Sequence, residues 1–138
     1  MALSPVYLAD KSALARMPMP AVRRRLEPLL VEGLIATCGI IDLEVGYSAR
    51  NADVHTQVRD ERRSLPRAPL DHEAFDRALE VQGLFAARGQ HRLPIPGLVI
   101  AACAEKVDLT VLHYDAEFER IAEVTGQPHE WVVPRATV

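Results

Sequence analysis

The stretch LTVLHYDAEFERIAEVTG, residues 109–126, decides the fold. Residues 109–114 are an apolar run that predicts a buried strand, and this strand ends at Asp115. Residues 116–126 predict a helix that Gly126 closes. A buried strand followed by an acid and then by a helix is typical of an α/β fold.

The same alternation of strands and helices extends outward along the chain. Strands are predicted at residues 6–9, 34–39, 109–114 and 130–133. Helices are predicted at residues 21–32, 41–49, 53–65, 71–88, 97–106 and 116–126, with a short helix capped by Ser12 and stopped by Pro18 and Pro20. This order predicts one α/β domain over residues 1–138, with a parallel sheet covered by helices on both faces.

The composition is typical of a soluble globular protein, with 49% hydrophobic and 25% charged residues. The longest uncharged apolar run, residues 98–104, is too short to span a membrane. Residues 1–10 lack the basic and long apolar regions of a secretion signal. Cys38 and Cys103 have no metal-ligand spacing, so we expect two buried, reduced thiols in a cytoplasmic protein.

The charge is distributed unevenly. A net charge of −3 does not indicate a nucleic-acid-binding protein by itself. Arginines nevertheless cluster at residues 23–25 and again at residues 59–67. Such a cluster fits either a solvated helix face or a surface for a polyanion or an acidic partner.

Acidic residues are predicted to meet at one edge of the sheet. Asp10 and Asp115 each end an apolar strand, Glu44 lies early in the helix after the second strand, and Gly97 opens the helix before the third. The carboxyl ends of parallel strands share one edge, where ligands bind. Each acid taken alone also fits a helix cap or a surface position. Together they repel one another, and a hard divalent cation such as Mg²⁺ explains their grouping.

This grouping indicates cleavage of a phosphodiester, because such a metal neutralises phosphate charge and activates water. Acyl, nucleotide and hydride chemistry lack support, since the chain contains no GxSxG, P-loop or GxGxxG motif. A phosphoacceptor receiver domain requires adjacent acids after the first strand and a lysine after a late strand. The segments ADKS and HYDA supply neither.

Four segments resemble the PIN-domain toxins of VapBC toxin–antitoxin modules, of the kind abundant in actinobacteria. They are VYLADKSAL, IIDLEVGYSAR, HRLPIPGLVIAACAE and LTVLHYDAEFERIAEVTGQPHEWV, in the order expected over essentially the whole chain. The resemblance implies a three-layer α/β/α sandwich with a central parallel sheet. It also implies RNA cleavage that depends on Mg²⁺ (or Mn²⁺), a VapB-type antitoxin encoded beside the chain, and a homodimer that forms hetero-oligomers with the antitoxin.

The resemblance also assigns roles to individual residues. Asp10, Glu44 and Asp115 match the family's catalytic and metal-binding acids. Glu117 matches a further acid found in some members. Ser12 matches a hydroxyl residue that supports the first acid, although simple helix capping explains it equally well.

Position 97 departs from the family pattern. The expected segment is PIPDLLIAA, whereas this chain reads PIPGLVIAA, so Gly97 stands where a metal-binding aspartate is expected. Glycine is a tolerable helix cap, and we therefore expect a normal fold. Loss of a ligand predicts impaired cleavage by a chain that still binds antitoxin or RNA. The alternative is a purely binding module without catalysis.

The sequence also predicts how His113 and Trp131 lie in the fold. We expect His113 to point to the opposite face of its strand from Tyr114, and the chain's histidines to have core or surface roles. Trp131 is expected to pack the last strand against a helix.

Overall fold

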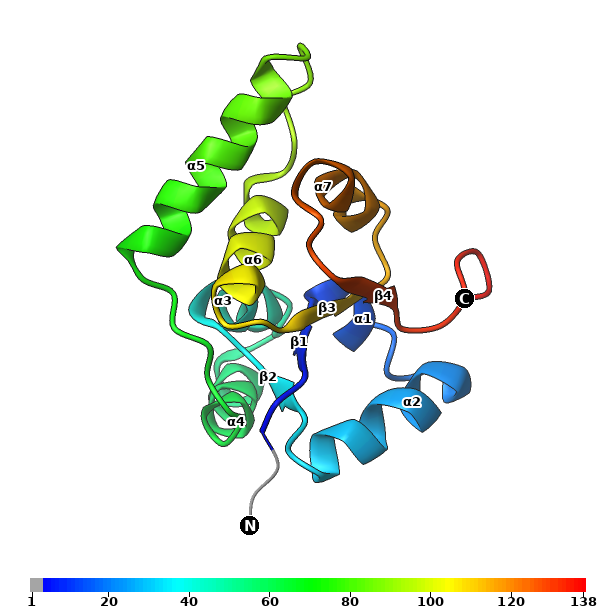
Figure 1. Cartoon of the computed structure of the whole chain (residues 1–138). Helices are drawn as coiled ribbons and strands as arrows, with labels where there is room; N and C mark the ends of the chain where they lie inside the picture. Colours follow the sequence, from blue (N-terminus) through cyan, green and yellow to red (C-terminus); the bar gives the residue numbers. More distant parts are fainter. Residues whose placement is uncertain (1–3) are drawn as a thin grey trace.

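The computed structural model describes residues 4–138 and contains one parallel sheet with the strand order β2-β1-β3-β4 (Figure 1). Leu8 lies opposite Ala36 on one side and Val111 on the other. The strands are β1 (Tyr7–Ala9), β2 (Ile35–Ala36), β3 (Thr110–His113) and β4 (His129–Trp131). Residues 1–3, part of the segment in which we expect no secretion signal, lie outside the described residues.

The helices are α1 (Lys11–Leu14), α2 (Pro20–Val31), α3 (Gly39–Tyr47), α4 (Ala52–Arg63), α5 (His72–Ala86), α6 (Ile95–Lys106) and α7 (Glu117–Thr125). Several ends follow directly from the sequence. The side chains of Asn51 and Asp71 cap α4 and α5 by accepting backbone hydrogen bonds. Gly126 ends α7 in the left-handed conformation at φ 74°, which glycine adopts without a steric penalty.

Two apolar cores lie on opposite faces of the sheet. Leu8 and Val111 pack with buried residues of α3, α5, α6 and α7, whereas Ala9 and Leu112 pack with α1 and α2. Alternate residues of a strand point to opposite faces, which explains this division. The predicted three-layer α/β/α arrangement is confirmed (Figure 1).

Observed element ends differ from the predicted ones by up to two residues, except that the second strand ends three residues earlier, and three of the differences have a local cause. The second strand covers only Ile35–Ala36, because Thr37 turns away to bridge Arg67 and α3 begins at Gly39. Helix α6 begins at Ile95, two residues before Gly97, since proline is tolerated in a first helical turn. The cap of α1 is Asp10 rather than Ser12.

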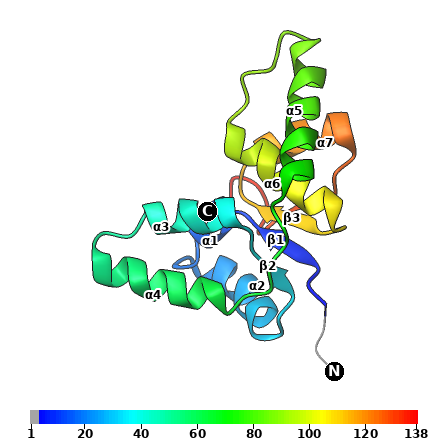
Figure 2. The ribbon, with the colours of Figure 1, turned by 90° about the vertical axis from the view of Figure 1, so that its left-hand side faces the viewer.

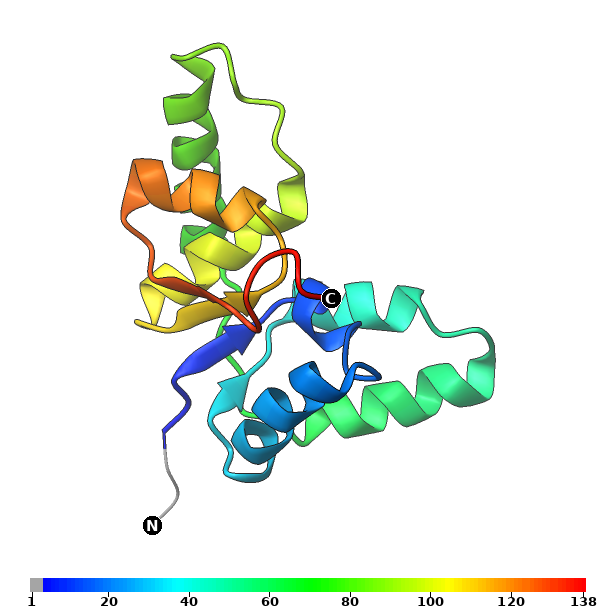
Figure 3. The ribbon, with the colours of Figure 1, turned by 90° about the vertical axis from the view of Figure 1, so that its right-hand side faces the viewer.

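Helices α3 and α4 form a hairpin that projects to one side of the sheet (Figures 2 and 3). Within residues 4–138, every helix is too short or too polar to traverse a bilayer. Cys38 and Cys103 are both buried and free, as predicted. Trp131 donates a 2.8 Å hydrogen bond to Glu119 of α7, which confirms that it joins the last strand to a helix.

Candidate functional site

Asp10 lies directly after β1 and is almost completely buried, with 7% of its surface exposed. Its Oδ2 accepts a 2.9 Å hydrogen bond from the backbone N–H of Ser12, so the carboxylate caps α1. Burial raises the pKa of Asp10, the hydrogen bonds from Ser12 oppose that rise, and the charge of Asp115 adds to it. Asp115 therefore lies close enough to Asp10 to influence it electrostatically at the same sheet edge.

Ser12 connects the two segments that carry these acids. Its Oγ accepts a 2.8 Å hydrogen bond from the backbone N–H of Tyr114, next to Asp115. Its own backbone N–H binds Asp10. Ser12 is thus placed to support Asp10 from inside α1 and is not the capping residue of that helix.

Asp115 begins the turn between β3 and α7. Its backbone N–H donates a 3.0 Å hydrogen bond to Nδ1 of His113, and its Oδ1 accepts a 2.9 Å bond from the backbone N–H of Glu117. The Glu117 carboxylate pairs with Arg120 at 3.4 Å, one turn along the same helix. The main chain therefore fixes Asp115, whereas Glu117 already has a cationic partner.

His113 is fully buried between the sheet and α7, where its ring lies 4.9 Å from that of Phe118. Because Nδ1 accepts the Asp115 N–H, the proton of the neutral ring is on Nε2, which faces Nδ1 of His129 at 2.9 Å. Burial and the neighbouring His129 lower the pKa of His113 to about 4. Its expected orientation is confirmed, since Tyr114 packs on the opposite core.

Glu44 enters the site from α3 and is half-buried. Its Oε1 is buried and has no hydrogen-bond partner among the described residues 4–138. Burial and the charge of Asp10 raise the pKa of Glu44, while Lys11 lowers it. A buried carboxylate oxygen without a partner is costly, which favours a cationic ligand at this position.

These carboxylates suit a hard divalent cation in their chemistry. The charge of Asp115 acts on Asp10, and the charge of Asp10 acts on Glu44. The Oε1 of Glu44, unpartnered among residues 4–138, is available as a metal ligand. Within residues 4–138, no three His, Cys, Asp or Glu side chains are grouped closely enough to hold a metal ion. These residues therefore match a divalent cation in the chemistry of their donor atoms, but they do not form a complete coordination shell.

Gly97 lies in the first turn of α6, whose end is joined to β3 by residues 107–109. This short connection turns the chain back, so the first turn of α6 lies at the edge where β3 ends. The backbone of Gly97 is not in the left-handed region, and an added Cβ would meet only Ile121 Cδ1 at 3.9 Å. Neither the backbone nor the packing requires glycine at this position.

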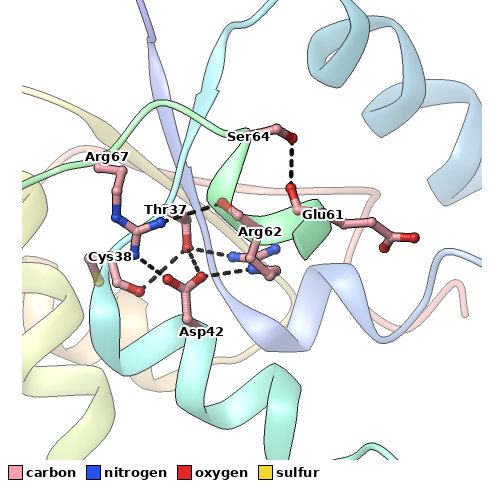
Figure 4. A network of polar contacts seen from close by, with 7 residues as sticks. All are labelled: Thr37, Cys38, Asp42, Glu61, Arg62, Ser64 and Arg67. Carbon is pink, nitrogen blue, oxygen red and sulfur yellow. Dashed lines mark hydrogen bonds and ion pairs between the residues drawn. The ribbon is translucent and has the colours of Figure 1, made fainter. Parts of the chain in front are cut away.

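A polar cluster that the sequence analysis missed fixes α3, the helix that carries Glu44 (Figure 4). Asp42 of α3 accepts hydrogen bonds from Arg62 of α4 at 2.8 Å, from Thr37 at 2.8 Å, and from Arg67. Burial raises the pKa of Asp42, but the hydrogen bonds from Arg67, Arg62 and Thr37 outweigh it and hold that pKa below its ordinary value. The one sequence signal for this cluster was Asp42 itself, an acid in the first turn of its helix that is followed by the arginines of residues 59–67.

A groove of about 750 Å³ lies between α3 and α4, away from the acids. Apolar side chains such as Leu43, Val58 and Phe75 line it, with Arg59 and Arg63 beside them. Part of the second arginine cluster therefore borders an apolar surface, while Arg62 and Arg67 bind Asp42.

Comparison with known proteins gives consistent results. The PIN domain family model matches residues 9–124. Ribonuclease VapC21 of Mycobacterium tuberculosis is 49% identical over 133 residues, covering 95% of this chain and 96% of that protein. Ribonuclease VapC51 of the same organism is 46% identical over 132 residues, covering 96% of each chain.

Solved structures share the fold at low sequence identity. A DNA-bound VapBC from Salmonella typhimurium matches with a TM-score of 0.75 and 18% identity, over 94% of this chain and 99% of that one. A DNA-bound VapBC2 from Rickettsia felis matches with a TM-score of 0.71 and 16% identity, over 91% and 97%.

Proposed function

The chain belongs to the PIN-domain family and groups with VapC ribonucleases, and on this premise we propose that it is the toxin of a type II VapBC-type module, an RNA endonuclease dependent on Mg²⁺ or Mn²⁺. The observation that carries the proposal is that Asp10 lies within electrostatic reach of both Asp115 and Glu44, with Glu44 Oε1 buried and unpartnered among residues 4–138.

Asp10, Glu44 and Asp115 are the residues that would hold the cation. When bound, such a cation neutralises phosphate charge and lowers the pKa of a coordinated water. Ser12 holds Asp10 in one orientation, and His113 holds the main chain of Asp115. Glu44 Oε1, which is buried and has no partner among the described residues, is an atom that would face the cation.

Gly97 makes this chain a poor nuclease in our proposal. It supplies no carboxylate in the first turn of α6, where the resemblance places a ligand. Misplacement of reacting groups costs on the order of 100-fold in rate. The second candidate is a module that binds antitoxin or RNA without catalysis, which the absence of a compact donor cluster within residues 4–138 favours.

The partner in this proposal is a VapB-type antitoxin, in the cytoplasm, bound to a homodimer of the chain. The apolar groove between α3 and α4 supports a protein partner, because an amphipathic helix can bury its apolar face there. Arg59 and Arg63 beside the groove suit acidic residues flanking that face.

The test compares RNA cleavage by the natural chain, Gly97→Asp and Gly97→Asn in Mg²⁺ or Mn²⁺. Aspartate and asparagine have similar volume, so only the charge separates the two variants. We expect Gly97→Asp to cleave about 100-fold faster than the other two. Equal cleavage by all three chains would refute the role of Gly97. Absence of cleavage by Gly97→Asp despite measurable Mn²⁺ binding would refute the ribonuclease and favour the binding module.

A further inference from the structure

Tyr47, the last residue of α3, is 88% exposed. No other large apolar or aromatic side chain in the described part of the chain is as exposed. An aromatic ring left in water forgoes a large gain from burial, which makes its position informative.

The ring lies beside the candidate site. Tyr47 follows Glu44 by three residues on the same helix, so the two side chains are neighbours on its surface. Lys11, which follows Asp10, places its ammonium 5.6 Å from the centroid of the Tyr47 ring. Helix α1, which begins with Lys11, packs against α3. A ring and a cation therefore flank two of the three acids.

Tyr47 lies at the margin of the apolar groove between α3 and α4. The groove lining includes Leu43 and Gly46 but not Tyr47, although Leu43, one helical turn before Tyr47, is itself 72% exposed. The residues after Tyr47 include the exposed Ser48 and Arg50. The Lys11 ammonium lies over the ring, and the 88% exposure of Tyr47 leaves ring surface for a flat ligand.

We propose that Tyr47 and Lys11 form a subsite for a single-stranded RNA nucleotide, with an unpaired base stacked on Tyr47 and a backbone phosphate on Lys11. The proposal rests on the proposed ribonuclease function and deepens it. Aromatic rings bind unpaired bases of any sequence by stacking, and cations beside them bind the backbone. A base inside a duplex is already stacked, so this subsite selects single strands next to the acids.

The test measures the Kd of a labelled single-stranded oligoribonucleotide and of its duplex by fluorescence anisotropy, at low salt in EDTA so that no cleavage occurs. Tyr47→Ala is expected to weaken single-strand binding about 10-fold, and Tyr47→Phe to preserve it. Lys11→Gln is expected to weaken binding and to reduce the salt dependence by about one phosphate contact. Val31→Ala, at an 82% exposed site on α2, is the matched control and leaves the Kd unchanged.

Either of two binding results would overturn the subsite. The first is a single-strand Kd for Tyr47→Ala equal to that of the natural chain, which would leave the ring to a protein partner. The second is an equal loss of single-strand and duplex binding. In the Gly97→Asp background, Tyr47→Ala should raise KM more than it lowers kcat. Cleavage by Gly97→Asp that is indifferent to Tyr47 would refute the subsite alone, whereas absence of cleavage despite metal binding would refute the ribonuclease.

Discussion

The backbone N–H of Asp115 donates a 3.0 Å hydrogen bond to Nδ1 of the fully buried His113. On its far side, Nε2 of the same ring faces His129 at 2.9 Å. The imidazole therefore holds the main chain of a candidate metal ligand with one nitrogen and is itself held through the other. This arrangement gives the buried histidine more than the packing role that the sequence predicted.

Substituting His113 by asparagine or by glutamine tests the roles of its two ring nitrogens separately. In the Gly97→Asp background, His113→Asn keeps an acceptor at the position of Nδ1 and should retain most cleavage. His113→Gln keeps only the outer donor and should lose about 10- to 100-fold in Mn²⁺ affinity or cleavage rate, as partners of metal ligands commonly do. Metal titration and kinetics measure both effects. Equal losses in the two variants would show that the ring acts through packing alone.

The pKa of His113 also predicts how stability depends on pH. Above pH 6.5 this residue is neutral in both the folded and the unfolded chain. Between pH 6.5 and about 4 the unfolded chain binds a proton here and the folded chain does not, so stability falls as pH falls. The loss amounts to at most about 3 kcal/mol. Urea unfolding at several pH values measures it, and His113→Asn should show a shallower decline across this window.

The cluster around Asp42 predicts that Arg62 and Arg67 contribute unequally to the free energy of unfolding. The Arg62 side chain is 11% exposed and that of Arg67 is 47% exposed. Arg62→Ala leaves a part-buried acid with fewer partners and should cost about 2–3 kcal/mol of unfolding free energy. Arg67→Ala removes a solvent-screened pair and should cost less than about 1 kcal/mol. Chemical denaturation of both variants decides the order, and a larger loss for Arg67→Ala would contradict it.

Gly97→Asp tests the metal site without any measurement of activity. In EDTA its stability should lie within about 1 kcal/mol of the natural chain, because an acid in a first helical turn is favourable but adds to existing negative charge. Added Mn²⁺ should raise the thermal midpoint of Gly97→Asp more than that of Gly97→Asn or the natural chain. A similar rise in all three would indicate that position 97 does not contact the cation.

The sequence predicted the features that depend on local patterns. Apolar runs located the strands, and an acid after β1 and after β3 predicted a site at the edge where parallel strands end. The beginning of α6 was missed since prolines around Ile95 suggested a loop, although a first turn tolerates them. The Asp42–Arg62 and His113–His129 contacts join separate elements, and no local pattern reports which distant side chains meet.

Helix α3 borders both the apolar groove and the candidate metal site. Asp42 and Leu43 line the groove against α4, whereas Glu44 belongs to the acidic edge. Asp42, Leu43 and Glu44 are consecutive residues of one nine-residue helix. A ligand in the groove and a cation at the acidic edge would therefore contact neighbouring residues of the same element.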